Sequence, residues 1–336
     1  MITLFYNDII KIVKAVTLPR FFHGLVEQLE KDFAHWSDFN IQPRLASHHP
    51  DGVIELMPTN TASRFAFKYV NGHPINAEKN NKLSIIGFGA LADAATGLPL
   101  VLTEMTILTA LRTAATSVVA AKHLANKNPK SMAIIGTGAQ SEFQALAFHH
   151  CLQVNRIKYF DKDPNAMLKF QHNLSSSDLQ LQAGSSIEDT INDCDIITTA
   201  TAAKKKSQLL SACQIQPGTL LNSIGGDCPG KTELNPDILD ISCIVVDFLE
   251  QAKIEGEIQN AKPNTEILEL QDIITGKKTA RKTAQDIILF DSVGCAVEDY
   301  SALEYIYKLA NELNIGQKDC FLPEPSDPKD LFSLLK

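Results

Sequence analysis

The chain has 336 residues, which is long for one hydrophobic core and predicts about two domains. Its net charge of −8 disfavours a nucleic-acid-binding protein, and its seven scattered cysteines are typical of reduced thiols in the cytoplasm. Because the first residues lack a signal peptide and no apolar stretch could span a membrane, we expect a cytoplasmic protein without a membrane partner.

The first part of the chain predicts an antiparallel or mixed sheet, because several short strands are separated by turns. A helix is expected over residues 18–39 and a second, longer one over residues 106–124. The expected strands cover residues 3–6, 44–48, 53–58, 64–70, 84–91 and 100–103.

Two cations of this part stand among small residues. Lys68 shares one face of its strand with Ala66 and Val70, so it is either a solvated edge residue or a buried cation that awaits an anion. Arg112 lies between Ala and Thr residues of the long helix. It is either a charge on the helix surface or part of an anion site.

Residues 131–161 form the pattern around which the second part is built. An apolar strand at 132–135 is followed by Gly136, Gly138 and Ser141, then by a helical pattern and a second strand that ends at Asp161. Strand, glycine turn, helix, strand and acid form the dinucleotide-binding unit. Because the Asp161 carboxylate can accept bonds from both ribose hydroxyls and would repel a 2′-phosphate, NAD is favoured over NADP.

Further apolar strands follow Asp161, and they predict a doubly wound parallel sheet. The carboxyl ends of such strands face the ligand crevice, so residues 199–201, 225–231 and 291–293 are expected near the nicotinamide. The fold class is therefore α/β, with a Rossmann-type parallel domain and an α+β domain. The further elements are strands at 195–201, 218–226, 243–248 and 287–294 and a helix at 296–313.

The histidines and Cys228 indicate neither a metal site nor a thiol nucleophile. His48, His49 and His73 lack metal-ligand spacing with acids or cysteines, so we predict no metal site. Cys228 has no histidine near it in sequence that could activate a thiol nucleophile.

The chain resembles the ornithine cyclodeaminase/μ-crystallin family over almost its whole length. NGHP, GGDCPGKTEL and DPKDLF resemble the bacterial cyclodeaminase branch in particular. The matching stretches are RLASH (44–48), GVIELMP (52–58), FKYVNGHP (67–74), LRTAATS (111–117), GAQSEFQALAFH (138–149), DIITT (195–199), GGDCPGKTEL (225–234), IEGEIQ (254–259), FDSVG (290–294) and DPKDLF (327–332).

The resemblance implies that L-ornithine becomes L-proline and ammonia while NAD⁺ is reduced and re-oxidised within one turnover. Hydride leaves Cα, the δ-amine attacks the iminium, ammonia leaves, and the hydride returns to the cyclic imine. It also implies a homodimer, with a substrate-binding and dimerisation domain at 1–117 and 300–336 and an NAD-binding Rossmann domain at 118–299.

The resemblance also implies roles for individual residues. Asp227 is the expected proton acceptor and donor, while Arg44, Lys68 and Arg112 hold the substrate carboxylate and Val293 lines the site. Apart from the resemblance, the δ-ammonium of the substrate needs an acidic partner, so Glu55 is either this partner or a carboxylate on the strand surface. The implied cofactor contacts are Ser84, Gly136, Gly138, Ala139, Gln140, Asp161, Thr201, Leu221, Asn222, Ser223, Ile224, Lys231 and Ser292.

Two other functions stay open on sequence grounds. One is a related enzyme with the same site: a lysine cyclodeaminase, an amino-acid dehydrogenase or a ketimine reductase. The other is a nucleotide-binding protein without turnover, which the complete set of Arg44, Lys68, Arg112 and Asp227 argues against. Sequence alone does not measure the substrate length that the pocket accepts, since one methylene is worth only about 1–3 kcal/mol.

Overall fold

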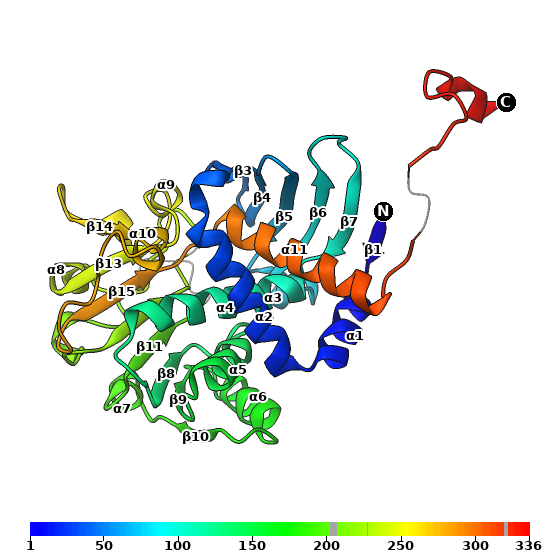
Figure 1. Ribbon diagram of the computed structural model, residues 1–336. Helices are drawn as coiled ribbons and strands as arrows, with labels where there is room; N and C mark the ends of the chain where they lie inside the picture. The colour runs from blue at the N-terminus through cyan, green and yellow to red at the C-terminus, as the bar shows by residue number, and fades with distance from the viewer. Residues whose placement is uncertain (202–206, 227, 319–321) are drawn as a thin grey trace.

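A computed structural model describes residues 1–201, 207–226, 228–318 and 322–336. Two sheets form the molecule, and long helices pack between and around them (Figure 1). One sheet is built from the first hundred residues and the other from the dinucleotide-binding pattern onwards.

The first sheet has seven strands in the order β1-β7-β6-β5-β4-β2, with β3 paired to β4. Because β1 pairs with β7 in parallel and the other pairs are antiparallel, the predicted mixed sheet is confirmed. Its strands are β1 (Ile2–Leu4), β2 (Asn40–Ile41), β3 (Leu45–His49), β4 (Gly52–Asn60), β5 (Arg64–Gly72), β6 (Ile85–Asp93) and β7 (Pro99–Glu104).

The two faces of β5 differ in an informative way. The small residue Ala66 and the cation Lys68 point into the molecule, and each is only 1% exposed. The aromatic face points outward, since Phe65 is 41% exposed and Phe88 on the neighbouring β6 is 44% exposed. The solvated-edge interpretation of Lys68 is therefore wrong, and this sheet leaves an apolar face uncovered.

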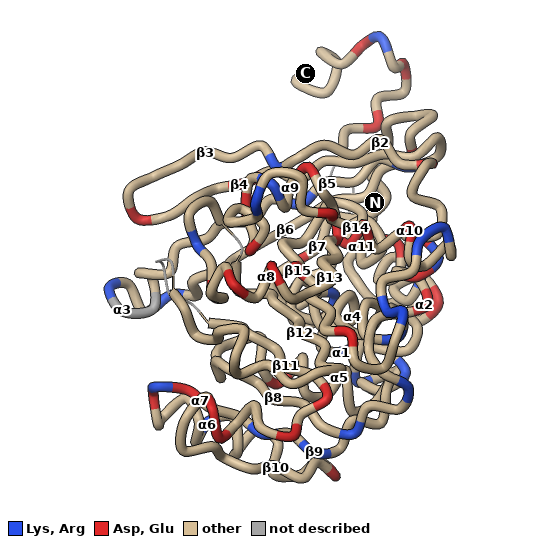
Figure 2. The backbone as a smooth tube through the Cα atoms, turned by 90° about the vertical axis from the view of Figure 1, so that its left-hand side faces the viewer, with Lys and Arg blue, Asp and Glu red and all other residues tan. Residues whose placement is uncertain are grey.

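The second sheet has eight parallel strands in the order β10-β9-β8-β11-β12-β15-β13-β14. Figure 2 views it so that the strands follow one another from β10 at the bottom towards β14. The chain order reverses between β8 and β11, which is where parallel sheets open a crevice at the carboxyl ends of their strands. The strands are β8 (Ser131–Ile135), β9 (Arg156–Phe160), β10 (Gln180–Ala183), β11 (Ile196–Thr199), β12 (Leu220–Ser223), β13 (Ser242–Val246), β14 (Ile267–Glu269) and β15 (Ile287–Asp291).

Three long helices lie between the sheets, namely α2, α4 and α11 (Figure 1). The predicted helices at 106–124 and 296–313 are confirmed at both ends, whereas the helix expected over 18–39 ends at Ala34. The strand expected over residues 3–6 is found at Ile2–Leu4, and α1, which was not predicted, begins at Tyr6. The helices are α1 (Tyr6–Val16), α2 (Leu18–Ala34), α3 (Asn76–Asn80), α4 (Thr106–Leu124), α5 (Ser141–Leu152), α6 (Pro164–Leu174), α7 (Ile187–Ile191), α8 (Asp237–Ile241), α9 (Leu249–Ala252), α10 (Leu270–Ile274) and α11 (Ala296–Leu313).

Helix α4 explains how the two sheets become one unit. Its alanines and valines are buried along almost the whole helix, so α2, α5 and α11 can all approach it closely. The polar exception is Arg112, which is 5% exposed. The helix-surface interpretation of this cation is therefore wrong. Among the described residues, no helix is both long enough and apolar enough to cross a membrane.

Candidate active site

The glycine turn lies between β8 and α5. Gly136 has a φ of +100°, and a Cβ there would meet the carbonyl oxygen of Ala200 at 2.7 Å, so only glycine fits this position. A Cβ on Gly138 would have no atom within 4 Å, so the space above this backbone is open to a ligand. The turn leads into the amino-terminal end of the twelve-residue α5, which offers unpaired N–H groups.

Asp161 lies beside this turn. Its Oδ2 accepts a hydrogen bond from the Thr137 backbone N–H at 2.7 Å, so the acid after β9 and the glycine turn form one rim. The Oε1 of Gln140 is buried without a hydrogen-bond partner at the start of α5. Open space, helix N–H groups and a carboxylate at the rim fit the phosphates and ribose of a dinucleotide.

Other predicted cofactor contacts follow the carboxyl ends of neighbouring strands. Thr201, after β11, donates through its N–H to Glu233 Oε1 at 2.7 Å, and Ser292, after β15, donates to Asp247 Oδ2 at 3.1 Å. Leu221, Asn222 and Ser223 lie within β12 with buried side chains, so any ligand contact there would use their backbone.

The buried cations Lys68 and Arg112 meet at two acids of α11. Lys68 Nζ lies 2.7 Å and Arg112 Nε 3.0 Å from Asp299 Oδ1. Arg112 Nη1 also lies 2.6 Å from Glu298 Oε2, which accepts a further bond from the Thr116 hydroxyl. Three elements, β5, α4 and α11, therefore hold one ionic network.

Arg44, just before β3, brings a third cation to this region. Its Nη1 lies 3.1 Å from Glu55 Oε2 and 3.1 Å from Glu255 Oε2, and its Nη2 donates to the carbonyl oxygens of Val293 and Gly294. Since Val293 and Gly294 directly follow β15, this cation lies at the carboxyl edge of the parallel sheet. Glu55 is buried, so the surface-carboxylate interpretation of this residue is wrong.

Burial dominates the electrostatics of this cluster. It lowers the pKa of Lys68 to about 8, helped by the nearby Arg112 charge, although Asp299 acts in the opposite direction. Burial and the Glu298 charge raise the pKa of Asp247 to about 7. The site therefore holds groups that can change protonation near neutral pH.

The sequence did not reveal the acids that neutralise these cations. Glu298 and Asp299 lie in the first turn of α11, directly after a strand end that was expected near the nicotinamide. Three cations on apolar elements need acidic partners when they pack into the molecule. This requirement was the only sequence signal that pointed to such acids. Glu255 lies within the matching stretch at 254–259.

Two predicted site residues are not part of this cluster as described. Asp227 lies outside the described residues. The Ser84 hydroxyl donates to the carbonyl oxygen of Pro74 at 3.5 Å, and its own carbonyl accepts from the His73 N–H.

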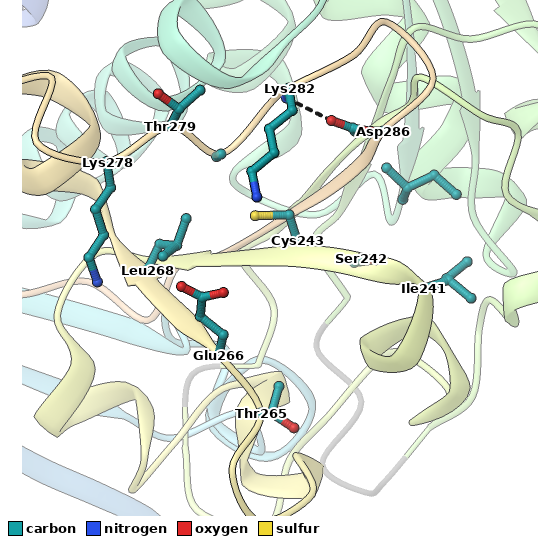
Figure 3. Close-up of a pocket in the computed structure, with 12 residues that line it drawn as sticks. Ile241, Ser242, Cys243, Thr265, Glu266, Leu268, Lys278, Thr279, Lys282 and Asp286 are labelled. Carbon is teal, nitrogen blue, oxygen red and sulfur yellow. Dashed lines mark hydrogen bonds between the residues drawn. The ribbon is translucent and has the colours of Figure 1, made fainter.

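A separate cavity of about 580 Å³ opens at the opposite edge of the parallel sheet. Figure 3 shows Cys243 at the beginning of β13, with the side chain of Lys282 above it and that of Lys278 to the left. Because this cavity lies at the amino ends of the strands, it is distant from the glycine turn and contains none of the predicted site residues. Among the described residues, no group of three or more His, Cys, Asp and Glu side chains could hold a metal ion.

Comparison with known proteins agrees with this geometry. The model of the ornithine cyclodeaminase/mu-crystallin family matches residues 7–314. The chain belongs to this family. It is 47% identical over 329 residues to an ornithine cyclodeaminase of Brucella suis biovar 1 (strain 1330), a match that covers 98% of this chain and 92% of the relative.

Two solved structures have the same fold. A lysine cyclodeaminase, studied for its recognition of L-lysine, L-ornithine and L-2,4-diaminobutyric acid, matches with a TM-score of 0.92 at 27% identity, covering 99% of both chains. A dimeric archaeal alanine dehydrogenase with bound NAD matches with a TM-score of 0.86 at 28% identity, covering 96% of this chain and 99% of the other.

The pKa of Lys68 makes a prediction about stability. Because this pKa is about 8 in the folded chain and 10.5 ordinarily, the unfolded chain binds more protons between these values, and stability rises with pH across that window. We expect wild type to gain about 2 kcal/mol relative to Lys68→Met between about pH 7 and pH 9.5. Urea unfolding of both proteins at the two pH values measures this gain, and a constant difference would contradict it.

Proposed function

We propose that this chain converts L-ornithine into L-proline and ammonia with NAD as its cofactor, and that it acts in the cytoplasm. The observation that carries the proposal is the meeting of three cations, two of them buried, with the buried Glu55 at the edge of the sheet that bears the glycine turn. A diamino acid has one carboxylate, which cations bind, and two amines, whose charged forms need an acidic partner such as Glu55. The choice of ornithine rests on the 47% identical relative.

The cofactor is proposed to lie along the glycine turn and the strand ends. Gly136 and Gly138 would admit the pyrophosphate, and Asp161 would bind the ribose hydroxyls. When bound, NAD supplies the hydride chemistry, which is reversible within each turnover. The remaining proposed contacts are Ser84, Ala139, Gln140, Thr201, Leu221, Asn222, Ser223, Ile224, Lys231 and Ser292.

Arg44, Lys68 and Arg112 would hold the substrate α-carboxylate, with Val293 against the substrate chain. Guanidinium groups bind a carboxylate in a fixed, bidentate geometry, so the clamp would orient Cα as well as bind it. Orientation of this kind lowers the barrier by up to about 7–11 kcal/mol in the best intramolecular models. Glu298 and Asp299 supply the counter-charge that keeps the cations buried in the absence of substrate.

Two acids would complete the chemistry. Asp227 would accept a proton from the substrate α-ammonium, since the nitrogen lone pair is needed before Cα can be oxidised. Glu55 would face the δ-ammonium, whose amine later attacks Cα. The buried position of the clamp excludes water, which protects the imine from hydrolysis.

We also propose a domain division and an oligomeric state. Residues 1–117 and 300–336 would form the substrate-binding and dimerisation domain, and residues 118–299 the NAD-binding domain. The exposed apolar face of the first sheet supports a homodimer, because such a face is normally covered by a partner. Its exposed side chains include Ile54, Leu56, Phe65, Ile86 and Phe88.

Removal of the proposed proton acceptor tests the reaction. With L-ornithine and catalytic NAD⁺, we expect wild type to form proline and ammonia in equal amounts, and Asp227→Asn to lose turnover by roughly 10²–10⁴-fold while still binding NAD. Chromatography of both products measures this loss. Near-normal turnover of the variant would remove Asp227 from the mechanism, and a faster reaction with lysine would change the substrate.

Asp161 makes a separate prediction about the cofactor. Without its carboxylate, Asp161→Ala should bind NAD more weakly and lose its discrimination against the 2′-phosphate of NADP. Fluorescence titration of both reduced cofactors measures the ratio of their dissociation constants. An unchanged ratio would mean that another group holds the ribose.

The apolar sheet face predicts the oligomeric state. We expect wild type to sediment as a dimer and Phe88→Glu to shift towards monomer, because a charge would be buried at the centre of the interface. Leu168→Glu is the matched control, since Leu168 is 62% exposed on α6, away from this face. A dimeric Phe88→Glu protein in analytical ultracentrifugation would show that the interface lies elsewhere.

A further inference from the structure

The loop that contains Asp227 is tied to one short segment of the chain. We define this loop as residues 225–234 and the segment as residues 255–260, most of which forms a short 3₁₀ helix (Glu257–Asn260). Gln259 Oε1 accepts from the Gly230 N–H at 2.7 Å, and Gln259 Nε2 donates to the Lys231 carbonyl oxygen at 3.3 Å. One amide side chain therefore holds the middle of the loop at two successive residues.

Glu257 holds the end of the same loop. Its Oε1 accepts from the Glu233 N–H at 2.7 Å and its Oε2 from the Leu234 N–H at 3.1 Å. The Ser223 hydroxyl, at the end of β12, donates to the same carboxylate at 3.2 Å. Glu257 thus fixes the loop to the strand from which it departs.

The beginning of the loop packs closely against the segment. A Cβ on Gly226 would lie 3.1 Å from Glu257 Oε1 and 3.4 Å from Gly256 Cα. A Cβ on Gly225 would contact the Glu233 carboxylate. The glycine pair before Asp227 is therefore explained by close approach of the backbone to the acids that anchor the loop.

The segment is itself held rigidly and reaches the substrate clamp. The Ile258 N–H donates to Asp291 Oδ2 at 3.0 Å, at the end of β15. Gly256 has a φ of +81°, and a Cβ there would lie within 3 Å of the Asp291 carboxylate. At the other end, Glu255 pairs with Arg44. One segment of six residues therefore contacts both the clamp and the loop.

We propose that Gln259 and Glu257 are positioning residues, which hold the described part of the 225–234 loop in one conformation for the proton transfer proposed for this loop. The inference rests on the proposed role of Asp227. A loop with glycines at 225, 226 and 230 has many accessible conformations, and ordering it costs about 1–2 kcal/mol per residue. Hydrogen bonds from a rigid segment offset this cost before the substrate arrives.

Gln259→Ala tests the inference, because Gln259 is only partly buried and its loss should leave the fold intact. We expect kcat with ornithine at saturating NAD to fall roughly tenfold while KM changes less than about twofold, since the carboxylate clamp is not on the loop. Gln259→Glu keeps an acceptor for the Gly230 N–H but sets a carboxylate oxygen against the carbonyl oxygens of Lys231 and Gly256, so its kcat should fall at least as far as that of Gln259→Ala.

A second readout does not depend on activity. Cys228 lies in the loop and is partly exposed, whereas Cys213 is exposed outside it. We expect Gln259→Ala to raise the alkylation rate of Cys228 by iodoacetamide at least about fivefold relative to Cys213, as measured on peptides by mass spectrometry. The matched control is Lys262→Ala, whose ammonium pairs with Asp240 at the surface, and it should change neither readout.

The outcomes separate this inference from the proposed function. Wild-type kcat and an unchanged Cys228 rate in Gln259→Ala would overturn the inference, and so would a fall in kcat without faster alkylation. Faster alkylation in a protein that forms no proline would support the anchoring of the loop while rejecting the proposed reaction. If Gln259→Ala does not fold, kcat and the alkylation rate of Cys228 are compared between Gln259→Glu and wild type instead.

Discussion

The need to neutralise buried cations constrains this structure more than any other interaction. Lys68 and Arg112 lie on different elements, and both depend on the carboxylate of Asp299. Removal of one partner from a buried ion pair leaves an unpaired charge, which costs about 3–5 kcal/mol. The first turn of α11 must therefore stay where the strand β5 and the helix α4 meet.

This constraint joins the two sheets. Helix α11 begins five residues after β15 of the parallel sheet and packs across the mixed sheet, so its acidic first turn stands between them (Figure 1). Arg44 makes a second connection, from the mixed sheet to Val293 and Gly294 at the end of β15. The ion network and the carboxyl edge of the parallel strands consequently occupy one region, where substrate and cofactor must meet for hydride chemistry.

Much of the fold could be predicted from sequence because its periodicities are strong. The apolar run before Gly136 and the small residues around Arg112 predicted β8 and α4 to within one residue. Helix α1 was missed because its amphipathic pattern follows a short strand directly. Among the site residues, the cations could be recognised from a family pattern and Glu55 from the charge of the substrate, and the structure adds that Lys68, Arg112 and Glu55 are buried.

The partners of these residues could not be predicted, because long-range pairing has no local signal. Asp299 lies 231 positions from Lys68, and Glu257 binds a loop that begins 32 positions earlier. The choice between a surface charge and a buried ion depends on packing of the whole chain, so Lys68 and Glu55 each kept two interpretations until the structure was known. The anchoring of the 225–234 loop likewise appears only when its hydrogen bonds are followed.

The most direct test of the central claim uses L-ornithine that carries deuterium at Cα. If oxidation and reduction occur at one carbon within one turnover, proline should retain the deuterium at its Cα, with ammonia released in equal amount and no net NADH. Mass spectrometry of the product measures this retention. Loss of the label to solvent, or a keto acid formed together with stoichiometric deuterated NADH, would contradict the account and indicate a dehydrogenase.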